Sequence, residues 1–74
     1  NFINLAFNFD YFQNEETNLN IRTLTGKIIK SVPVSLSNGY NNMEIDLKDL
    51  PKGIYFLTIN SFQTFRLEKR FIKM

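Results

Sequence analysis

The 74-residue sequence contains no cysteine, no histidine and no tryptophan. Without cysteine and histidine, a disulfide framework, the usual zinc sites and the common nucleophile–base pairs of enzymes are all excluded. A chain this short buries only about 60% of the surface that its unfolded form exposes. We therefore expect one domain over residues 1–74, stabilised by apolar packing, by strand pairing or by a neighbouring domain, with no cofactor.

The sequence also lacks a long apolar run and a concentrated block of like charges. No stretch reaches about 18 apolar residues, so no transmembrane segment is predicted. The net charge is +2, and the basic residues are dispersed, whereas nucleic-acid-binding surfaces usually concentrate them. The stretch FRLEKRFIKM (65–74) could stack on single-stranded nucleic acid, but we prefer a terminal strand with Phe65, Leu67 and Phe71 packed inward. No nucleic-acid partner is predicted.

Strand periodicity dominates the sequence instead. Apolar and polar residues alternate in segments that predict strands at 3–9, 17–24, 27–36, 41–47, 54–60 and 64–74. Thr25-Gly26 predicts a hairpin turn between the second and third strands, and Ser37–Tyr40 predicts a turn after the third. This number and spacing of strands indicate a small all-β sandwich or barrel.

Two features predict where individual strands lie. Pro33 removes a backbone donor from the third strand, which favours an edge position or a bulge. Nearly every residue from Ile54 to Ile59 is apolar, on both alternating sets, which is typical of a central strand buried on both faces or lying beside another domain. Just before this strand, Pro51 and Gly53 fit the second and fourth positions of a type I turn.

Catalytic chemistry finds little support in the remaining motifs. Glu44 and Asp46 lie two residues apart on one strand face, but a solvated face explains them better than an acid–base pair. The pair Glu15-Glu16 is interpreted as part of a polar loop rather than as a metal site. Around Thr25-Gly26-Lys27 (25–27), the sequence lacks the first glycine and the final hydroxyl residue of a phosphate-binding loop. We predict that the domain is not an enzyme.

Two sequence motifs and a basic final segment follow one another in order: LNIRTLTGKIIKS (19–31), IDLKDLPKGIYFLTIN (45–60) and LEKRFIKM (67–74). This order resembles the type A C-terminal sorting domain of the type IX (Por) secretion system of Bacteroidetes. Members of that family typically read I-Y-D-L-x-G-K-x-V, then I-D-L-S-x-L-x-x-G-I-Y-F-L-x-I, then K-x-x-K. The motif positions in this chain are Gly26, Lys27, Asp46, Leu47, Leu50, Pro51, Gly53, Ile54, Tyr55 and Lys73. The chain departs from the pattern at Arg22-Thr23, where the family prefers Tyr-Asp, and at Lys48, where Ser is common.

The resemblance implies an immunoglobulin-like antiparallel β-sandwich of about six to seven strands. It also implies a fragment of a larger secreted protein, as a first residue of Asn1 rather than Met suggests. The N-terminal cargo would pass through the periplasm and the type IX outer-membrane translocon, with outer-membrane shuttle proteins, to the cell surface or the medium. A surface sortase-like protease would then remove the domain, often joining the cargo to anionic lipopolysaccharide.

Within this resemblance, most motif residues have a simpler structural explanation. Turn geometry explains Gly26 and Gly53, and a place in the core explains Tyr55. Lys69, Arg70 and Lys73 are the predicted translocon-recognition residues, because an exposed terminal strand offers an edge for pairing together with positive charge. We expect only a small folding role for Lys73, a lone charge near the end of the chain.

An adhesion or carbohydrate-binding β-sandwich is the alternative function. Such a module binds polysaccharide through solvent-exposed aromatic side chains, and Tyr11 and Phe12 are the best candidates in this sequence. Binding of a soluble glycan by the isolated domain would favour this alternative.

Overall fold

The computed structural model describes residues 2–10, 14–61 and 66–74. These residues form six strands: β1 (Phe2–Phe9), β2 (Glu15–Thr23), β3 (Ile28–Leu36), β4 (Gly39–Asp46), β5 (Gly53–Asn60) and β6 (Arg66–Lys73). In this part of the chain there is no helix with the length and apolar character needed to cross a membrane. The all-β class predicted from the alternation of apolar and polar residues is confirmed.

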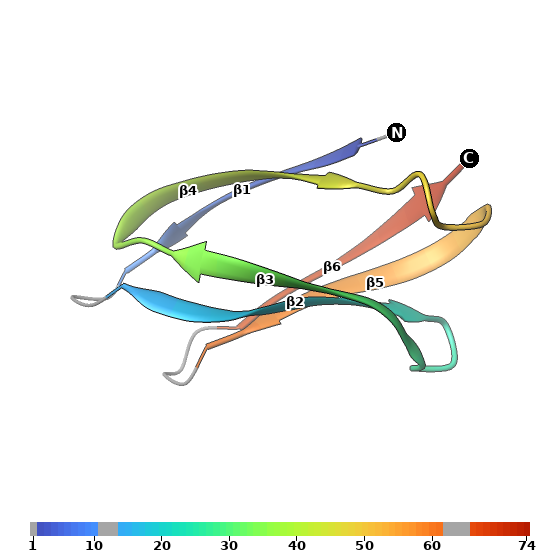
Figure 1. Cartoon of the computed structure of the whole chain (residues 1–74), viewed down its shortest axis with the longest axis horizontal. Helices are drawn as coiled ribbons and strands as arrows, with labels where there is room; N and C mark the ends of the chain where they lie inside the picture. The colour runs from blue at the N-terminus through green and yellow to red at the C-terminus, as the bar shows by residue number, and fades with distance from the viewer. Residues whose placement is uncertain (1, 11–13, 62–65) are drawn as a thin grey trace.

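The strands form two antiparallel sheets that pack face to face (Figure 1). One sheet pairs β1 with β4, and the other has the strand order β3-β2-β5-β6. The result is a small immunoglobulin-like sandwich rather than a closed barrel. The predicted β2–β3 hairpin is confirmed, as are the edge position of the strand that contains Pro33 and the inner position of β5.

Aliphatic side chains at alternate strand positions fill the space between the sheets. Leu19 and Ile21 on β2 are directly opposite Ile59 and Leu57 on β5, and all of them are fully buried. Each contributes about 2 kcal/mol through removal of apolar surface from water. The other buried apolar residues are Leu5, Phe9, Leu36, Ile45, Leu47, Leu50 and Tyr55.

The last strand packs as predicted where it is described. Leu67 and Phe71 are half-buried against the core, whereas Phe65 lies outside the described residues. The core position predicted for Tyr55 is also confirmed. The second burial surface predicted for β5 is not fully formed, because Ile54 is exposed on the outer side of the sheet.

The β2–β3 hairpin turns one residue earlier than predicted. The Gly26 N–H donates to the Thr23 carbonyl at 2.9 Å, and the Thr23 N–H donates to the Lys27 carbonyl at 2.9 Å. Leu24 and Thr25 are therefore the central turn residues, and Gly26 follows them with φ of +94°, where a side chain would be strained. The turn role of Gly26 is confirmed, although its position in the turn differs.

A buried asparagine stabilises the passage from β3 to β4, which lie in different sheets. The Asn41 Nδ2 donates to the carbonyls of Ser37 and Gly39 at 2.8 and 3.0 Å. Its Oδ1 accepts from the Ser37 N–H at 2.9 Å. Ser37 lies outside the strands, where the chain leaves one sheet, and the Asn41 side chain supplies partners for its N–H and carbonyl. The sequence predicted the turn but not this residue's role.

Two strands, β2 and β4, begin two residues earlier than predicted. β2 begins at Glu15, which lies opposite Leu36, so Glu15 and Glu16 are strand residues rather than loop residues. Backbone pairing with β3 keeps this polar segment extended, although its side chains carry no apolar alternation. β4 begins inside the predicted turn, because Gly39 pairs with Phe9 of β1.

We expect Asn41→Ala to lower the free energy of unfolding by about 2 kcal/mol, because the backbone groups of Ser37 and Gly39 lose three partly buried hydrogen bonds. Urea denaturation measures this difference. The matched control is Asn42→Ala, which truncates the exposed neighbour on the opposite face of β4 and should change stability by less than about 0.5 kcal/mol. Equal effects of the two substitutions would contradict the role assigned to Asn41.

Candidate functional site

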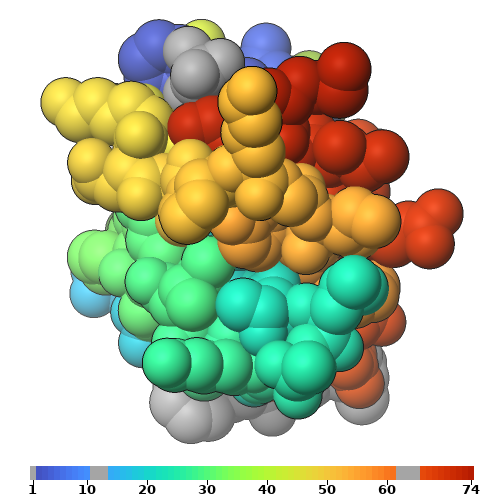
Figure 2. Space-filling view, turned by 90° about the vertical axis from the view of Figure 1, so that its right-hand side faces the viewer, coloured from blue at the N-terminus to red at the C-terminus, as the bar shows by residue number. Residues whose placement is uncertain are grey.

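The corner between β4 and β5 is defined here as residues 46–53. It carries five of the ten motif residues, namely Asp46, Leu47, Leu50, Pro51 and Gly53. Figure 2 shows the end of the sandwich where this corner (yellow to orange) lies beside the β2–β3 hairpin (teal to green) and the C-terminal residues (red). The Asp46 Oδ1 accepts from the Lys48 N–H at 3.0 Å, and the Leu50 N–H donates to the Leu47 carbonyl at 3.0 Å. Leu47 and Leu50 point their side chains into the core.

Lys73 binds this corner from the end of β6. Its Nζ donates to the Leu47 carbonyl at 2.7 Å and to the Leu50 carbonyl at 2.8 Å, in a partly buried position. The expectation of a small folding role for Lys73 is therefore wrong, because its ammonium group satisfies two carbonyls that no strand pairs. A role of Lys73 in recognition stays a prediction.

The hydrogen-bonded turn of the corner does not lie at 50–53, where a type I turn was predicted. In that turn the Leu50 carbonyl would accept from the Gly53 N–H, but here it accepts from Lys73. The hydrogen-bonded turn instead covers 47–50. Pro51 and Lys52 follow as an exposed link into β5, so Pro51 remains a corner residue but not the second residue of a hydrogen-bonded turn.

Lys30 binds the corner from the opposite edge of the four-stranded sheet. Its Nζ donates to the Asp46 carbonyl at 3.1 Å and lies 3.8 Å from the Asp49 Oδ2. This contact of Lys30 with the corner was not predicted from the sequence. A signal was present, because Lys30 shares its strand phase with the inward-facing Val32 and Leu36, and a lysine at an inward position requires acceptors.

Tyr55 completes the corner near the start of β5. Its hydroxyl donates to the Pro51 carbonyl four residues earlier, a contact similar to the tyrosine corners of immunoglobulin-like sandwiches. The Tyr55 ring packs at 5.6 Å from the ring of Phe71 on β6. A Cβ on Gly53 would make ordinary van der Waals contact with the Tyr55 hydroxyl oxygen at 3.6 Å, so the positive φ of +157° rather than lack of space favours glycine here.

The structure gathers the motif residues at one end of the sandwich but does not bring them into a single contact group. Asp46, Leu47, Leu50 and Tyr55 meet in the corner, whereas Gly26 and Lys27 lie in the β2–β3 hairpin loop. Lys27 and Ile54 are exposed. Ile54 faces outward on the four-stranded sheet, because the next residue along β5 is buried.

Lys69 and Arg70 lie in the middle of β6, an outer strand of its sheet. Both are exposed, and neither has an ion-pair partner among the described residues. Successive strand residues point to opposite faces, so Lys69 is on the side of Phe71, while Arg70 is on the outer face. The three predicted recognition residues thus share a strand but not a face, and Lys73 is already bound by the corner.

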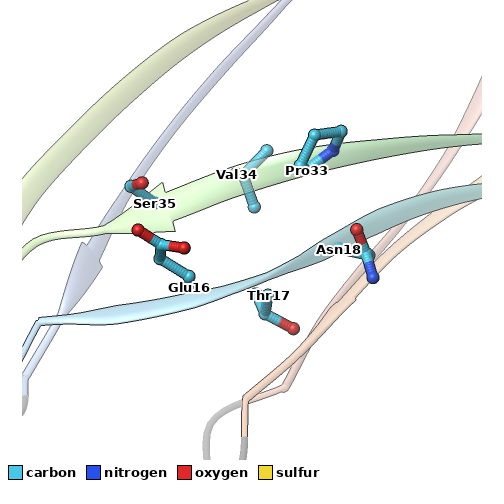
Figure 3. Close-up of a pocket in the computed structure, with 6 residues that line it drawn as sticks. All are labelled: Glu16, Thr17, Asn18, Pro33, Val34 and Ser35. Atoms are coloured by element: carbon cyan, nitrogen blue, oxygen red, sulfur yellow. The ribbon is translucent and has the colours of Figure 1, made fainter.

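A hollow of about 350 Å³ lies on β2 and β3, lined by Glu16, Thr17, Asn18, Pro33, Val34 and Ser35. Figure 3 shows that the side chains from the two strands point in different directions rather than toward one point. The lining contains one carboxylate and no basic side chain, so it lacks the convergent groups of a catalytic pocket. Within the described ranges, no three acidic residues gather as a metal-binding group. Tyr11 and Phe12, the proposed glycan platform, lie outside the described residues.

Comparison with known proteins gave one match. A family model described as "Secretion system C-terminal sorting domain" matches residues 1–74, the whole chain. No curated protein matches the sequence. No solved structure matches it either.

We expect Lys73→Met to lower the free energy of unfolding by about 1.5 kcal/mol, because two partly buried carbonyls lose a charged donor. Lys69→Met is the matched control, since it removes an exposed lysine from the same face of β6 and should change stability by less than about 0.5 kcal/mol. Guanidinium denaturation of the two variants measures the difference. If both variants unfold at the same denaturant concentration, Lys73 does not stabilise the corner.

Proposed function

The chain belongs to the secretion system C-terminal sorting domain family, and on this basis we propose that the type IX outer-membrane translocon recognises its folded sandwich through strand β6. The family consists of sorting signals for export to the cell surface or the medium in Bacteroidetes, and it is not a family of enzymes. The family supports a secretion sorting signal as the function of the chain, and in this proposal the domain binds its partners and catalyses no reaction.

The observation that supports β6 as the recognised element is its exposed position at the edge of the sheet. An outer strand presents backbone groups that another strand can pair with. Lys69 and Arg70 add positive charges that no acidic residue in the described part of the chain neutralises, and such charges accelerate association with an acidic partner. Lys73 serves this surface indirectly, since it fixes the end of β6 against the corner.

In this proposal, residues 1–74 form a single domain at the C-terminal end of a larger secreted protein. The fused N-terminal cargo reaches the periplasm first, and outer-membrane shuttle proteins of the type IX system then bind the domain. After passage through the translocon, a sortase-like protease at the cell surface removes the domain and joins some cargoes to lipopolysaccharide. Recognition of a folded surface agrees with a chain in which motif residues such as Leu47, Leu50 and Tyr55 pack in the core while Lys69 and Arg70 of β6 stay exposed.

The experiment is a fusion of residues 1–74 to a periplasmic fluorescent reporter in a type IX-competent bacterium. We expect the reporter outside the cell, without the domain, and we expect it to remain in the periplasm of a strain that lacks the translocon. An intact fusion held in the periplasm of the competent strain would contradict the proposed function.

Within the same assay, Lys69→Gln combined with Arg70→Gln should reduce secretion about tenfold, because two unpaired charges are lost from the recognised strand. The matched control is Lys48→Gln combined with Lys52→Gln, which removes the same charge from exposed corner positions and should leave secretion unchanged. Circular dichroism verifies that both double variants fold. Equal secretion by the two would exclude β6 charge as the recognised feature.

A further inference from the structure

The outer face of the four-stranded sheet carries an apolar and basic patch close to the corner. Arg22 on β2 is the register partner of Ile28 on β3 and of Phe56 on β5, and Phe56 is the partner of Arg70 on β6. These residues form a row across the sheet, and the cross-strand pair Ile54 and Ile72 adjoins it. The outer-face patch is defined by Arg22, Ile28, Ile54, Phe56, Arg70 and Ile72.

The apolar members of this patch are open to solvent. Ile28 is 46% exposed, Ile54 is 38% exposed and Ile72 is 61% exposed, while Phe56 is half-buried between the two arginines. In a sandwich whose sheets face water on one side, outward positions are expected to be polar. A contiguous apolar group at such positions marks an interaction surface.

The other outward surfaces of the same molecule carry mostly polar side chains, as expected. Farther along the four-stranded sheet, the outward pairs are polar or carry proline, such as Asn20 with Ser31 and Asn60 with Arg66. On the two-stranded sheet, Asn4 faces Glu44, and the two exposed aromatics Phe2 and Tyr40 lie at opposite ends. The apolar side chains are thus contiguous on the outer-face patch but isolated on the other sheet.

The charges of the patch indicate its partner. Arg22 and Arg70 flank Phe56, and the nearest outward carboxylate on β6, Glu68, already lies 3.7 Å from Arg66. Arg22 donates to the Gly26 carbonyl at 3.2 Å through Nη1, which orients the guanidinium and leaves other N–H groups available. Arginine and aromatic residues are enriched at the centres of protein interfaces, and guanidinium groups bind carboxylates with two parallel hydrogen bonds.

We propose that the outer-face patch is the docking surface for a protein component of the export machinery whose own surface presents apolar side chains flanked by carboxylates. The inference rests on the proposed function, since the partner is encountered during export. It explains why the outward residues Ile54 and Phe56 of β5 are apolar: the inward face of the strand packs in the core of the sandwich, and this partner covers the outward residues near the corner. A sheet face holds its side chains in a fixed register, which suits a second folded surface.

The test places a photoreactive amino acid at position 72 or at position 40 of the secreted reporter fusion. Ile72 and Tyr40 are similarly exposed, at 61% and 67%, but Tyr40 lies on the other sheet. Irradiation during export should give an adduct with a protein of the outer-membrane secretion machinery from position 72 and none from position 40. Adding Arg70→Glu should reduce the adduct about tenfold, whereas Lys52→Glu, an equal charge change at the corner, should not.

Separate readouts distinguish failure of this inference from failure of the proposed function. If the unaltered fusion is not secreted, both are overturned. If it is secreted but position 72 gives no adduct with the machinery, only the docking surface is overturned. An adduct with a lipid or with a second copy of the chain would also overturn it, because either would be a different occupant. The comparison of positions 72 and 40 uses fusions that keep Arg70. It therefore decides the outcome even if Arg70→Glu folds poorly.

Discussion

The carbonyl groups of the β4–β5 corner impose the constraint on which the rest of this structure depends. Side chains from other strands donate to the carbonyl of Asp46, the last residue of β4, and to the carbonyls of Leu47, Leu50 and Pro51, which lie between β4 and β5. A buried carbonyl without a donor costs about 1–3 kcal/mol, a large share of the stability of a small domain. Lys30, Lys73 and Tyr55 remove this cost from three different strands.

These donors make the hydrogen bonding of the corner depend on the complete fold. Lys30 is on β3 and Lys73 is on β6, the two outer strands of the four-stranded sheet, and each lies at least 16 residues from its acceptor. The corner therefore reaches its final hydrogen bonding only when both outer strands have paired. A partner that binds next to the corner would distinguish a folded domain from a partly folded one, as the proposed recognition requires. The outer-face patch adjoins this end of the sheet and shares β6 with the proposed recognition strand.

The sequence alone predicted the features that follow from periodicity and from single-residue backbone chemistry. Alternation located the strands, Pro33 indicated an edge strand, and the apolar run from Ile54 indicated the central one. Long-range side-chain contacts were not predictable in this way, because nothing in the local pattern shows which carbonyls lack a partner. Asn41, Lys30 and Lys73 are the examples. The inward strand phase of Lys30 indicated that it needs acceptors, but not which carbonyls supply them.

The corner depends on Lys73 for its local stability, and amide hydrogen exchange of Leu50 tests this most directly. The Leu50 N–H donates to the Leu47 carbonyl and closes a turn over 47–50. The carbonyls of the first and last residues of that turn, Leu47 and Leu50, accept from Lys73. In Lys73→Met, exchange at Leu50 should accelerate at least about tenfold more than exchange at Leu57 in the core, because the corner opens locally. Equal acceleration at the two amides, or none at Leu50, would contradict the account.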